Sequence, residues 1–398
     1  MSGHDPRAHT QPAEGRRDDF VYIDSKKVLD QWVADARSML SDGSEARCCI
    51  DTEADSLHHF QEKLCLIQIA FGGRFALVDP LAVADVGSLI ALMDDCELWM
   101  HGADYDLTML RKAYGWSPKN VRDTQIAARL VGHRQFGLAA LVENVFGKTL
   151  SKASQKEDWS RRPLPETMLR YAVDDVRYLI PLADHLSEKL RESRREEWFL
   201  QSCRSLQDGV AARSISPRED PWRVQGSGRL QPKGLALLKA LWEWREGAAG
   251  ERDIPCFRVM SNKQMLDYAI QFESGGRLSP PAGWRTKWKR DFSDIVSALG
   301  ETDAAGWPSK LKKPRGRLSD DARQHVENLC RLRDARAQEL GIESSLLGSR
   351  ATLELVVASP TGLNELIPWQ RELLAEGITR MSKELHPGVP EPVPSSVG

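Results

Sequence analysis

Residues 49–55 read CIDTEAD, and this short stretch ends an apolar run with two acids, Asp51 and Glu53. An apolar run of this length is typical of a buried strand. On a strand, residues i and i+2 point to the same side, so both carboxylates are expected to face one ligand. Taken alone, such a pair of acids on a strand is most often exposed to solvent and binds no metal. A prediction of metal binding therefore needs further acids elsewhere in the chain.

Two further segments end a hydrophobic run with acid. In MHGADYDLTML, Asp106 follows an expected strand and opens an expected helix, where negative charge is favoured. In LRYAVDDVRYL, Tyr171 and Asp175 are four residues apart and share one face of a helix. A fold that brings these acids to Asp51 and Glu53 builds a cage of negative oxygens. Such a cage is stable around hard divalent cations, and paired cations are a common device for cutting phosphodiester bonds.

The bulk composition is that of an ordinary protein with two or three domains. The chain has 398 residues, 28% charged and 41% hydrophobic, with a net charge of -2 and a pI near 6.5. No global basic signature of a nucleic-acid binder is present, so any basic surface must be local. The seven cysteines are odd in number and lack C-x-x-C spacing, which indicates reduced thiols. With no secretory signal and no apolar run of membrane-spanning length, we expect a cytoplasmic protein.

The first half of the chain predicts an α/β domain over residues 19–205. The stretch KLCLIQIAFGGRFALVDP reads as two strands around a Gly-Gly turn, and CELWMHG reads as another strand before a helix. Later residues of this part recur at helical spacing. We expect a mixed sheet flanked by helices, with the Asp51–Glu53 strand at its centre. Residues 206–228 lose this rhythm and are expected to be a linker.

The second half reads as all-helical, in two parts, 229–300 and 318–385. The two parts match at an offset of 88 residues, with Arg245 paired with Arg333 and Ile254 with Ile342. We interpret them as two copies of one small helical module, the alternative being two unrelated amphipathic hairpins. Residues 301–317 are expected to be a basic linker, and 1–18 and 386–398 to be disordered.

The order and spacing of the acidic motifs resemble the three exonuclease motifs of the DEDD superfamily, in its tyrosine-containing branch. Further stretches are similar to the ribonuclease D family: FQEKLCLIQIAF, VRDTQIAARL, GLAALVENVFGKTLSK, DWSRRPLPETMLRYAVDDVRYL and RLQPKGLALLKALWEWRE. The resemblance covers about residues 20–300. The helical modules resemble the helicase-and-RNase-D C-terminal (HRDC) domain.

This resemblance implies a ribonuclease H-like exonuclease domain followed by two HRDC-like domains. It implies 3′–5′ hydrolysis of RNA to nucleoside 5′-monophosphates with two divalent ions, Mg²⁺ or Mn²⁺. Asp51 would bridge both ions, Glu53 and Asp175 would complete the site of the ion that activates water, and Asp106 would serve the other ion. Tyr171 would orient the attacking water, because its ordinary pKa near 10 keeps it protonated.

Other conspicuous residues near these motifs are expected to be structural. Asp55, Asp104 and Asp174 fall on the wrong side by periodicity. Asp123 looks like a helix N-cap, and His101 is expected to fix the turn at the following glycine.

Substrate contacts are less specific in the sequence. Phe60 is expected either to stack on the last base or to be a core residue. Lys152 and Gln155 are expected to touch backbone phosphates, with simple solvation as the alternative.

Two basic runs, WRTKWKR and KLKKPRGR, fit an RNA-holding surface on the helical part. The alternative is a solvated basic linker with Trp284 and Trp288 in a core. The expected partner is RNA, such as tRNA precursors and other small structured RNAs, bound by a monomer. A DNA exonuclease of the same superfamily and a non-catalytic RNA-binding scaffold remain as alternative functions.

Overall fold

The computed structural model describes residues 20–40, 46–214, 219–301, 304–310 and 318–385, which divide into two compact units. The first unit contains the described residues of 1–54, 64–213 and 317–398, and the second contains those of 55–63 and 214–316. The segments expected to be disordered, 1–18 and 386–398, lie outside the described residues, as does most of the basic run 310–317.

A six-stranded mixed sheet is the centre of the first unit. Its strands are β1 (Phe20–Ile23), β2 (Arg47–Ala54), β3 (Leu64–Phe71), β4 (Arg74–Val78), β5 (Glu97–Met100) and β6 (Val121–Asp123). They lie in the order β1-β4-β3-β2-β5-β6. The β2–β3 and β3–β4 pairs are antiparallel, and the other three pairs are parallel. The expected mixed sheet is therefore confirmed, and β2, which carries the acids, has neighbours on both sides.

The hairpin between β3 and β4 follows directly from its two glycines. Phe71 pairs with Arg74, which leaves Gly72 and Gly73 as a two-residue loop. Both glycines have positive φ, at 56° and 77°. This is the conformation that tight hairpin turns require and that residues with a Cβ adopt only with strain.

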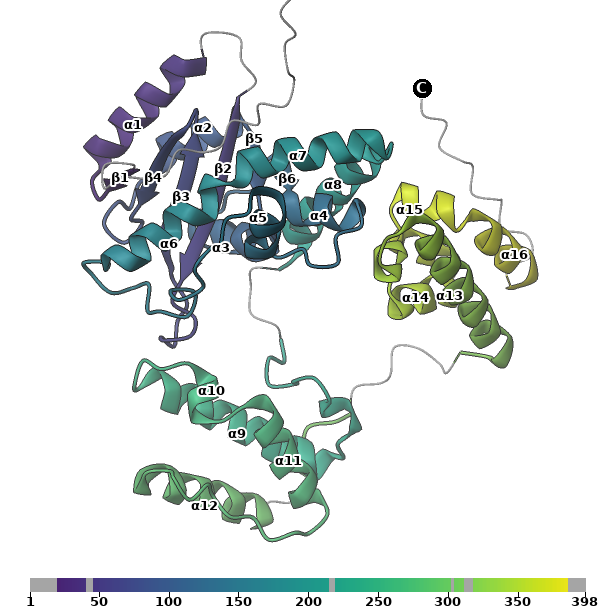
Figure 1. Cartoon of the computed structure of the whole chain (residues 1–398). Helices are drawn as coiled ribbons and strands as arrows, with labels where there is room; N and C mark the ends of the chain where they lie inside the picture. The colour runs from purple at the N-terminus through teal and green to yellow at the C-terminus, as the bar shows by residue number, and fades with distance from the viewer. Residues whose placement is uncertain (1–19, 41–45, 215–218, 302–303, 311–317, 386–398) are drawn as a thin grey trace, which may run out of the picture. The chain divides into compact units, whose positions relative to one another are not determined.

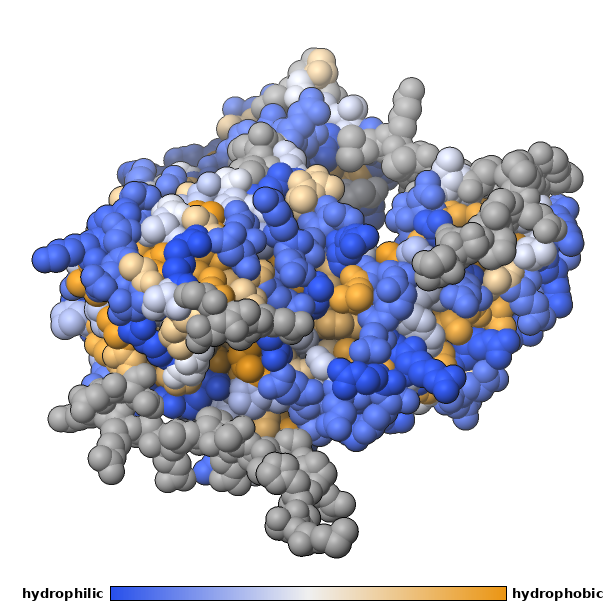
Figure 2. Space-filling view, turned by 90° about the horizontal axis from the view of Figure 1, so that it is seen from above, coloured by the Kyte–Doolittle hydropathy of each residue, from blue (hydrophilic) through white to orange (hydrophobic). Residues whose placement is uncertain are grey.

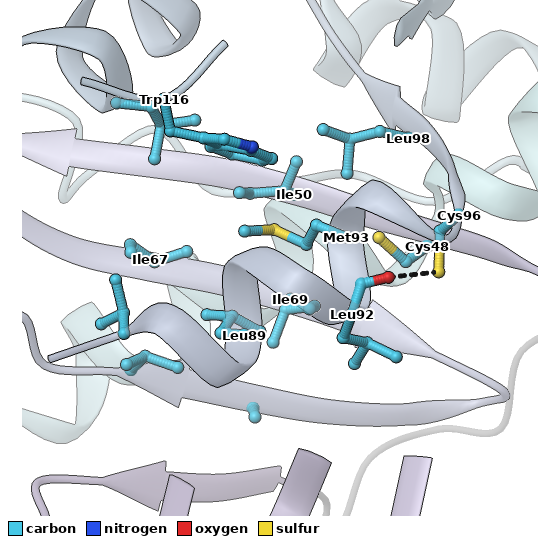
Figure 3. Packing of buried hydrophobic residues seen from close by; sticks show 14 of the residues in the cluster. Cys48, Ile50, Ile67, Ile69, Leu89, Leu92, Met93, Cys96, Leu98 and Trp116 are labelled. Atoms are coloured by element: carbon cyan, nitrogen blue, oxygen red, sulfur yellow. Dashed lines mark hydrogen bonds between the residues drawn. The ribbon is translucent and has the colours of Figure 1, made fainter. Parts of the chain in front are cut away.

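Helices cover both faces of the sheet. Their bounds are α1 (Lys26–Met39), α2 (Gly87–Asp94), α3 (Asp104–Tyr114), α4 (Thr124–Leu130), α5 (Leu138–Phe146), α6 (Glu166–Arg177), α7 (Leu179–Glu192) and α8 (Glu196–Ala212). On one face, α2 packs its apolar side onto β2 and β3, as Figure 3 shows for Leu89, Leu92 and Met93 against Ile50, Ile67 and Ile69. On the other face, α6 and α7 cross the sheet (Figure 1). Side chains alternate along β2, so the acids, two residues apart, share one face.

The helical stretch after Pro165 is three helices rather than one continuous pattern. It breaks at Tyr178 and again at Arg194, whose φ of 57° is incompatible with a right-handed helix. The third helix, α8, continues to Ala212 and so enters the segment expected to be a linker. That expectation is corrected here: Val210 is buried in the core of the first unit.

The second unit is helical and has its own core. Its helices are α9 (Pro232–Gly250), α10 (Cys256–Val259), α11 (Asn262–Glu273) and α12 (Thr286–Glu301), with a 3-10 turn η2 (Ser227–Arg229) and a further turn η3 (Ala304–Gly306). Trp284 and Trp288 pack with Trp244 in an aromatic cluster. The tryptophans of the first basic run therefore take the core positions that the alternative interpretation required.

Residues 318–385 form a second helical module, which belongs to the first unit. Its helices are α13 (Asp320–Leu340), α14 (Arg350–Ala358), α15 (Pro368–Leu373) and α16 (Ala375–Leu385), with 3-10 turns η4 (Ser344–Leu347) and η5 (Pro360–Glu365). Trp369 stacks on Trp198 of α8 with ring centroids 4.9 Å apart.

The two helical modules share local hydrogen bonds at the offset of 88 residues. Arg245 donates to the Met260 carbonyl, and Arg333 donates to the Gly348 carbonyl. The next residue in each case, Ser261 or Ser349, caps the following helix by accepting from a backbone N–H. These matching bonds favour one repeated module over two unrelated hairpins.

All seven cysteines are free, as expected. Within the described part of the chain, no helix has the length and apolarity needed to cross a bilayer. On the face drawn in Figure 2, hydrophobic residues lie scattered among hydrophilic ones, a pattern ordinary for protein surfaces.

Candidate active site

The strand β2 presents two acids from the interior of the sheet. Asp51 lies opposite Gln68 of β3, and Glu53 lies opposite Leu66. The register shifts between Glu53 and Ala54, where the strand ends. The helix α6, which packs on β2, β3 and β4, supplies the next acid.

Asp51, Glu53 and Asp175 converge. One carboxylate oxygen of each lies within 4.8 Å of the corresponding oxygens of the other two. Asp175 comes from α6, more than 100 residues away along the chain. The structure thus brings together three of the acids that the sequence singled out.

Asp106 is not one of these three acids, but it interacts electrostatically with each of them. It is 6% exposed, in the first turn of α3. Its Oδ1 accepts from the Thr52 backbone N at 3.1 Å and from Thr52 Oγ1 at 2.5 Å. Thr52 stands between the two acids of β2, so the strand that carries them also fixes the fourth carboxylate. Sequence reasoning did not identify this role of Thr52.

The crowded acids have strongly raised pKa values. Burial is the largest cause in each case. Burial and the neighbouring carboxylates raise the pKa of Glu53 to about 9 and that of Asp51 well above its usual range. Burial raises the pKa of Asp175 to about 7 and that of Asp106 to about 6, in both cases against opposing hydrogen bonds. Four acids that resist ionisation together need positive charge among them to be ionised at neutral pH.

Tyr171 lies one helical turn before Asp175 and hydrogen-bonds it. Burial, followed by the charges of Asp175, Glu53 and Asp51, raises the pKa of the Tyr171 hydroxyl. The hydroxyl therefore stays protonated at neutral pH and serves as a hydrogen-bond donor. Its ring packs against buried Trp159, with centroids 6.0 Å apart.

Asp123 organises the turn that leads into α3. It caps α4 by accepting from the backbone of Gln125 and Ile126, which confirms the expected N-cap. It also accepts from the backbone N–H groups of Gly102 and Ala103, both at 2.9 Å. The same carboxylate thus holds the loop from which Asp106 projects.

His101 has a structural position beside this loop. Its Nδ1 lies 2.9 Å from Thr124 Oγ1, and burial lowers its pKa. A neutral, half-buried imidazole fits the expected structural role.

Arg162 fastens the segment that precedes α6. Its Nε and Nη2 bind the Asp79 carboxylate at 2.5 and 2.7 Å, and Nη2 also donates to the Cys65 carbonyl. Burial raises the pKa of Asp79, but the hydrogen bonds from Arg162 and Tyr22 outweigh it and the pKa is lowered. These bonds make the segment around Trp159 and Arg162 a packed structural turn, and the sequence did not reveal Asp79 as its partner.

The acids that the sequence places on the wrong side to join the site interact with other residues. Asp104 pairs with Arg213 at 2.5 Å, and Asp174 pairs with Arg177 at 3.2 Å. Asp55 is fully buried and accepts from the Lys63 backbone N at 2.7 Å.

The three residues expected to contact substrate do not all belong to one unit. Lys152 and Gln155 are exposed in the segment before Trp159. Phe60 belongs to the second unit, where its half-buried ring packs against a cluster that includes Ala249 and Val259. Its position matches the alternative that the sequence left open, a core residue.

The donor set fits hard divalent cations. Carboxylate oxygens are the ligands that Mg²⁺ and Mn²⁺ prefer, and the trio offers no sulfur or imidazole. The raised pKa values of the same groups show that positive charge is favoured there.

A mixed sheet with acids on β2, on the first turn of α3 and on α6 defines a nuclease of the exonuclease class, and comparison with known proteins agrees. Residues 21–191 match the family model described as 3′-5′ exonuclease, and residues 234–272 match the HRDC domain. The ribonuclease D of Cronobacter turicensis is 35% identical over 342 residues, which cover 83% of this chain and 92% of that protein. The ribonuclease D of Escherichia coli is 28% identical over 348 residues, covering 84% and 92%.

The fold comparison points the same way. The crystal structure of Escherichia coli RNase D, titled an exoribonuclease involved in structured RNA processing, superposes with a TM-score of 0.68 at 24% identity, covering 92% of this chain and 99% of that one. A crystal structure of a protein from Bifidobacterium adolescentis gives a TM-score of 0.72 at 23% identity, covering 92% and 98%. The chain belongs to the ribonuclease D family of 3′–5′ exoribonucleases.

Proposed function

We propose that this protein shortens RNA from the 3′ end, one nucleoside 5′-monophosphate at a time, using two divalent metal ions. The observation that carries the proposal is the convergence of Asp51, Glu53 and Asp175, each with a raised pKa. A lone carboxylate would form an ion pair or be hydrated, whereas these three carboxylates lie close to one another. Such an arrangement costs stability unless cations occupy it.

The residues would divide the work according to their positions. Asp51 would be shared by both ions, Glu53 and Asp175 would hold the ion next to the attacking water, and Asp106 would serve the second ion. Bound ions supply a water of lowered pKa and stabilise the charge that develops on the phosphate. Mg²⁺ and Mn²⁺ both suit these ligands.

Tyr171 would position the attacking water. Its hydroxyl is a donor at neutral pH because its pKa lies above the ordinary value of 10. It therefore orients a water or a phosphate oxygen and does not act as a base.

The natural substrates we propose are tRNA precursors and other small structured RNAs, bound by a monomer in the cytoplasm. The relative with the matching fold is described as acting in structured RNA processing. The module of residues 318–385 would be a second HRDC-like domain, supported by the matching bonds of Arg245 and Arg333. Lys152 and Gln155 would contact backbone phosphates near the site.

The test is digestion of a 5′-labelled single-stranded RNA and of a DNA with the same sequence, in Mg²⁺. We expect a ladder of RNA products that shorten from the 3′ end, with nucleoside 5′-monophosphates released, and slower loss of the DNA. Asp51→Asn should abolish the ladder, whereas Asp104→Asn, a neighbouring acid paired with Arg213, should retain it. Equal activity of Asp51→Asn and the unmodified protein would remove the metal assignment.

A further inference from the structure

The second unit contains a pocket that the exonuclease chemistry does not use. Its volume is about 430 Å³. One wall is the segment 55–63, with His59 and Phe60. The other wall comes from α9, α10 and the start of α11, with Arg245, Phe257 and Asn262.

The segment 55–63 is held to the helices by specific bonds, so the pocket is a built feature. Asp253 binds it twice: Oδ1 accepts from the Phe60 backbone N at 3.1 Å, and Oδ2 lies 2.7 Å from His59 Nδ1. Arg258 donates to the Leu57 carbonyl at 2.9 Å. The Phe60 ring fills the space beside Gly250, where a Cβ would come within 3.3 Å of it.

An exposed aromatic ring stands at this pocket. Phe257, in α10, is 53% exposed, the highest value among the large hydrophobic residues that the structure describes as exposed. About half of this residue is therefore open to solvent. Its ring offers a face on which a flat, apolar ligand can stack.

Hydrogen-bond donors line the same pocket. The Arg245 side chain is 7% exposed, and its Nη1 donates to Asn262 Oδ1 at 2.7 Å. Its buried Nε has no partner among the described residues. Because Asn262 Oδ1 is engaged, the amide presents its Nδ2 as a donor. The pocket therefore combines an aromatic face with donors that match the carbonyl and ring-nitrogen acceptors of a nucleobase.

The charges favour a base over a phosphate. The Arg245 guanidinium is paired with Glu246 at 3.0 Å, and Glu62 lines the opposite wall. A phosphate needs surplus positive charge, and the carboxylates of Glu246 and Glu62 offset the positive charge of Arg245. A nucleobase is neutral and suits this balance.

The repeated module shows that these side chains are not required by the fold. At the offset of 88 residues, Arg333 keeps the structural bond of Arg245, but Ser345 replaces Phe257 and Arg350 replaces Asn262. Arg350 is committed to ion pairs with Glu327 and Glu354. The ring and the amide are therefore additions to the first module alone.

Few residues of the chain separate the carboxylates of β2 from the first residue that lines this pocket. Ser56, which lines the pocket, follows Glu53 by three residues. Three residues of extended chain span at most about 10 Å, wherever the rest of the second unit lies. We propose that the pocket binds one unpaired nucleobase of the RNA strand, stacked on Phe257 and hydrogen-bonded by Asn262; this rests on the proposed function.

Binding in a non-cleaving background tests the pocket separately from catalysis. The full chain carrying Asp51→Asn is titrated into a 5′-fluorescein-labelled single-stranded RNA in Mg²⁺ and followed by fluorescence anisotropy. Adding Phe257→Ala should raise the Kd about fivefold or more, the usual effect of losing one base–aromatic stack. Phe257→Trp, which keeps an aromatic face, should retain the affinity. Val28→Ala, an exposed residue of α1 at 37%, is the matched control and should leave it unchanged.

A crosslink adds an independent readout. RNA carrying 5-iodouridine, irradiated on the same Asp51→Asn chain, should attach to the peptide that contains Phe257. An unchanged Kd for Phe257→Ala, no crosslink to this peptide, or no RNA binding at all would each overturn the pocket assignment. If Phe257→Ala weakens binding while the unmodified protein degrades no RNA, the pocket stands and the proposed function fails.

Discussion

Replacing Glu53 with glutamine should abolish RNA cleavage and, in the absence of metal, make the protein more stable. The reason lies in the raised pKa of Glu53. Burial, Asp175 and Asp106 raise it from 4.5 to about 9. Above pH 4.5 the unfolded chain ionises this group while the folded protein keeps it protonated, so stability falls as pH rises towards about 9. Glutamine keeps the shape and removes this dependence.

The size of the effect follows from the shift. At pH 8.5 the solution pH lies about 4 units above the unfolded pKa of 4.5 and below the folded pKa of about 9, and one unit corresponds to about 1.36 kcal/mol. The upper limit is therefore about 5 kcal/mol. The carboxylates titrate as one coupled set, so the single substitution should recover only part of this, about 2 kcal/mol. For a unit of this size we expect a Tm higher by about 4–8 °C.

Differential scanning fluorimetry in EDTA at pH 5 and pH 8.5 measures the change. The gain for Glu53→Gln should be large at pH 8.5 and small at pH 5. Glu166→Gln is the matched control, because Glu166 is exposed and forms a surface ion pair with Arg170 at 3.1 Å, so its loss should cost about 0–1 kcal/mol. An unchanged or lower Tm for Glu53→Gln at pH 8.5 would refute the account of the crowded acids.

Three other substitutions probe the supports of the site. Tyr171→Phe should lower kcat by about 100-fold with little change in KM, because a donor that orients the water acts mainly in the transition state. Steady-state kinetics on RNA measure both constants, and a change in KM alone would contradict this role. Thr52→Val should weaken Mg²⁺ binding, because it removes a hydrogen bond that favours the ionised form of Asp106. A titration of activity against Mg²⁺ should then show a higher midpoint, and an unaltered midpoint counts against this role of Thr52. Arg162→Ala should destabilise the protein by about 2–4 kcal/mol, because it removes the arginine that is ion-paired with the buried Asp79 carboxylate. Urea unfolding measures this, and a loss under about 1 kcal/mol would show the ion pair to be dispensable.

Much of the catalytic half of the fold was predictable because its signals are local. The apolar run before Asp51, the Gly-Gly hairpin and the strand before Asp106 each specify an element within about ten residues. Periodicity placed Asp51 with Glu53 and Tyr171 with Asp175, and the resemblance to the exonuclease motifs grouped these residues with Asp106. The structure brings Asp51, Glu53 and Asp175 together as that grouping requires.

The remaining features depend on contacts that a local pattern does not contain. Arg162 and Asp79 are 83 residues apart, and nothing in either segment marks the other as its partner. The helix that continues to Ala212 lies in a stretch with weak periodicity, and packing against the first unit decides its length. Segment 55–63 belongs to the second unit because of bonds to Asp253 and Arg258, nearly 200 residues later.

Crystals soaked in Mn²⁺ and measured at the manganese absorption edge test the central claim most directly. The anomalous difference map should contain two neighbouring peaks, one between Asp51, Glu53 and Asp175 and one on the Asp106 side of Asp51, and Glu53→Gln should weaken the first. A map without peaks at these carboxylates, from crystals that bind Mn²⁺ elsewhere, would contradict the assignment of the acids as metal ligands.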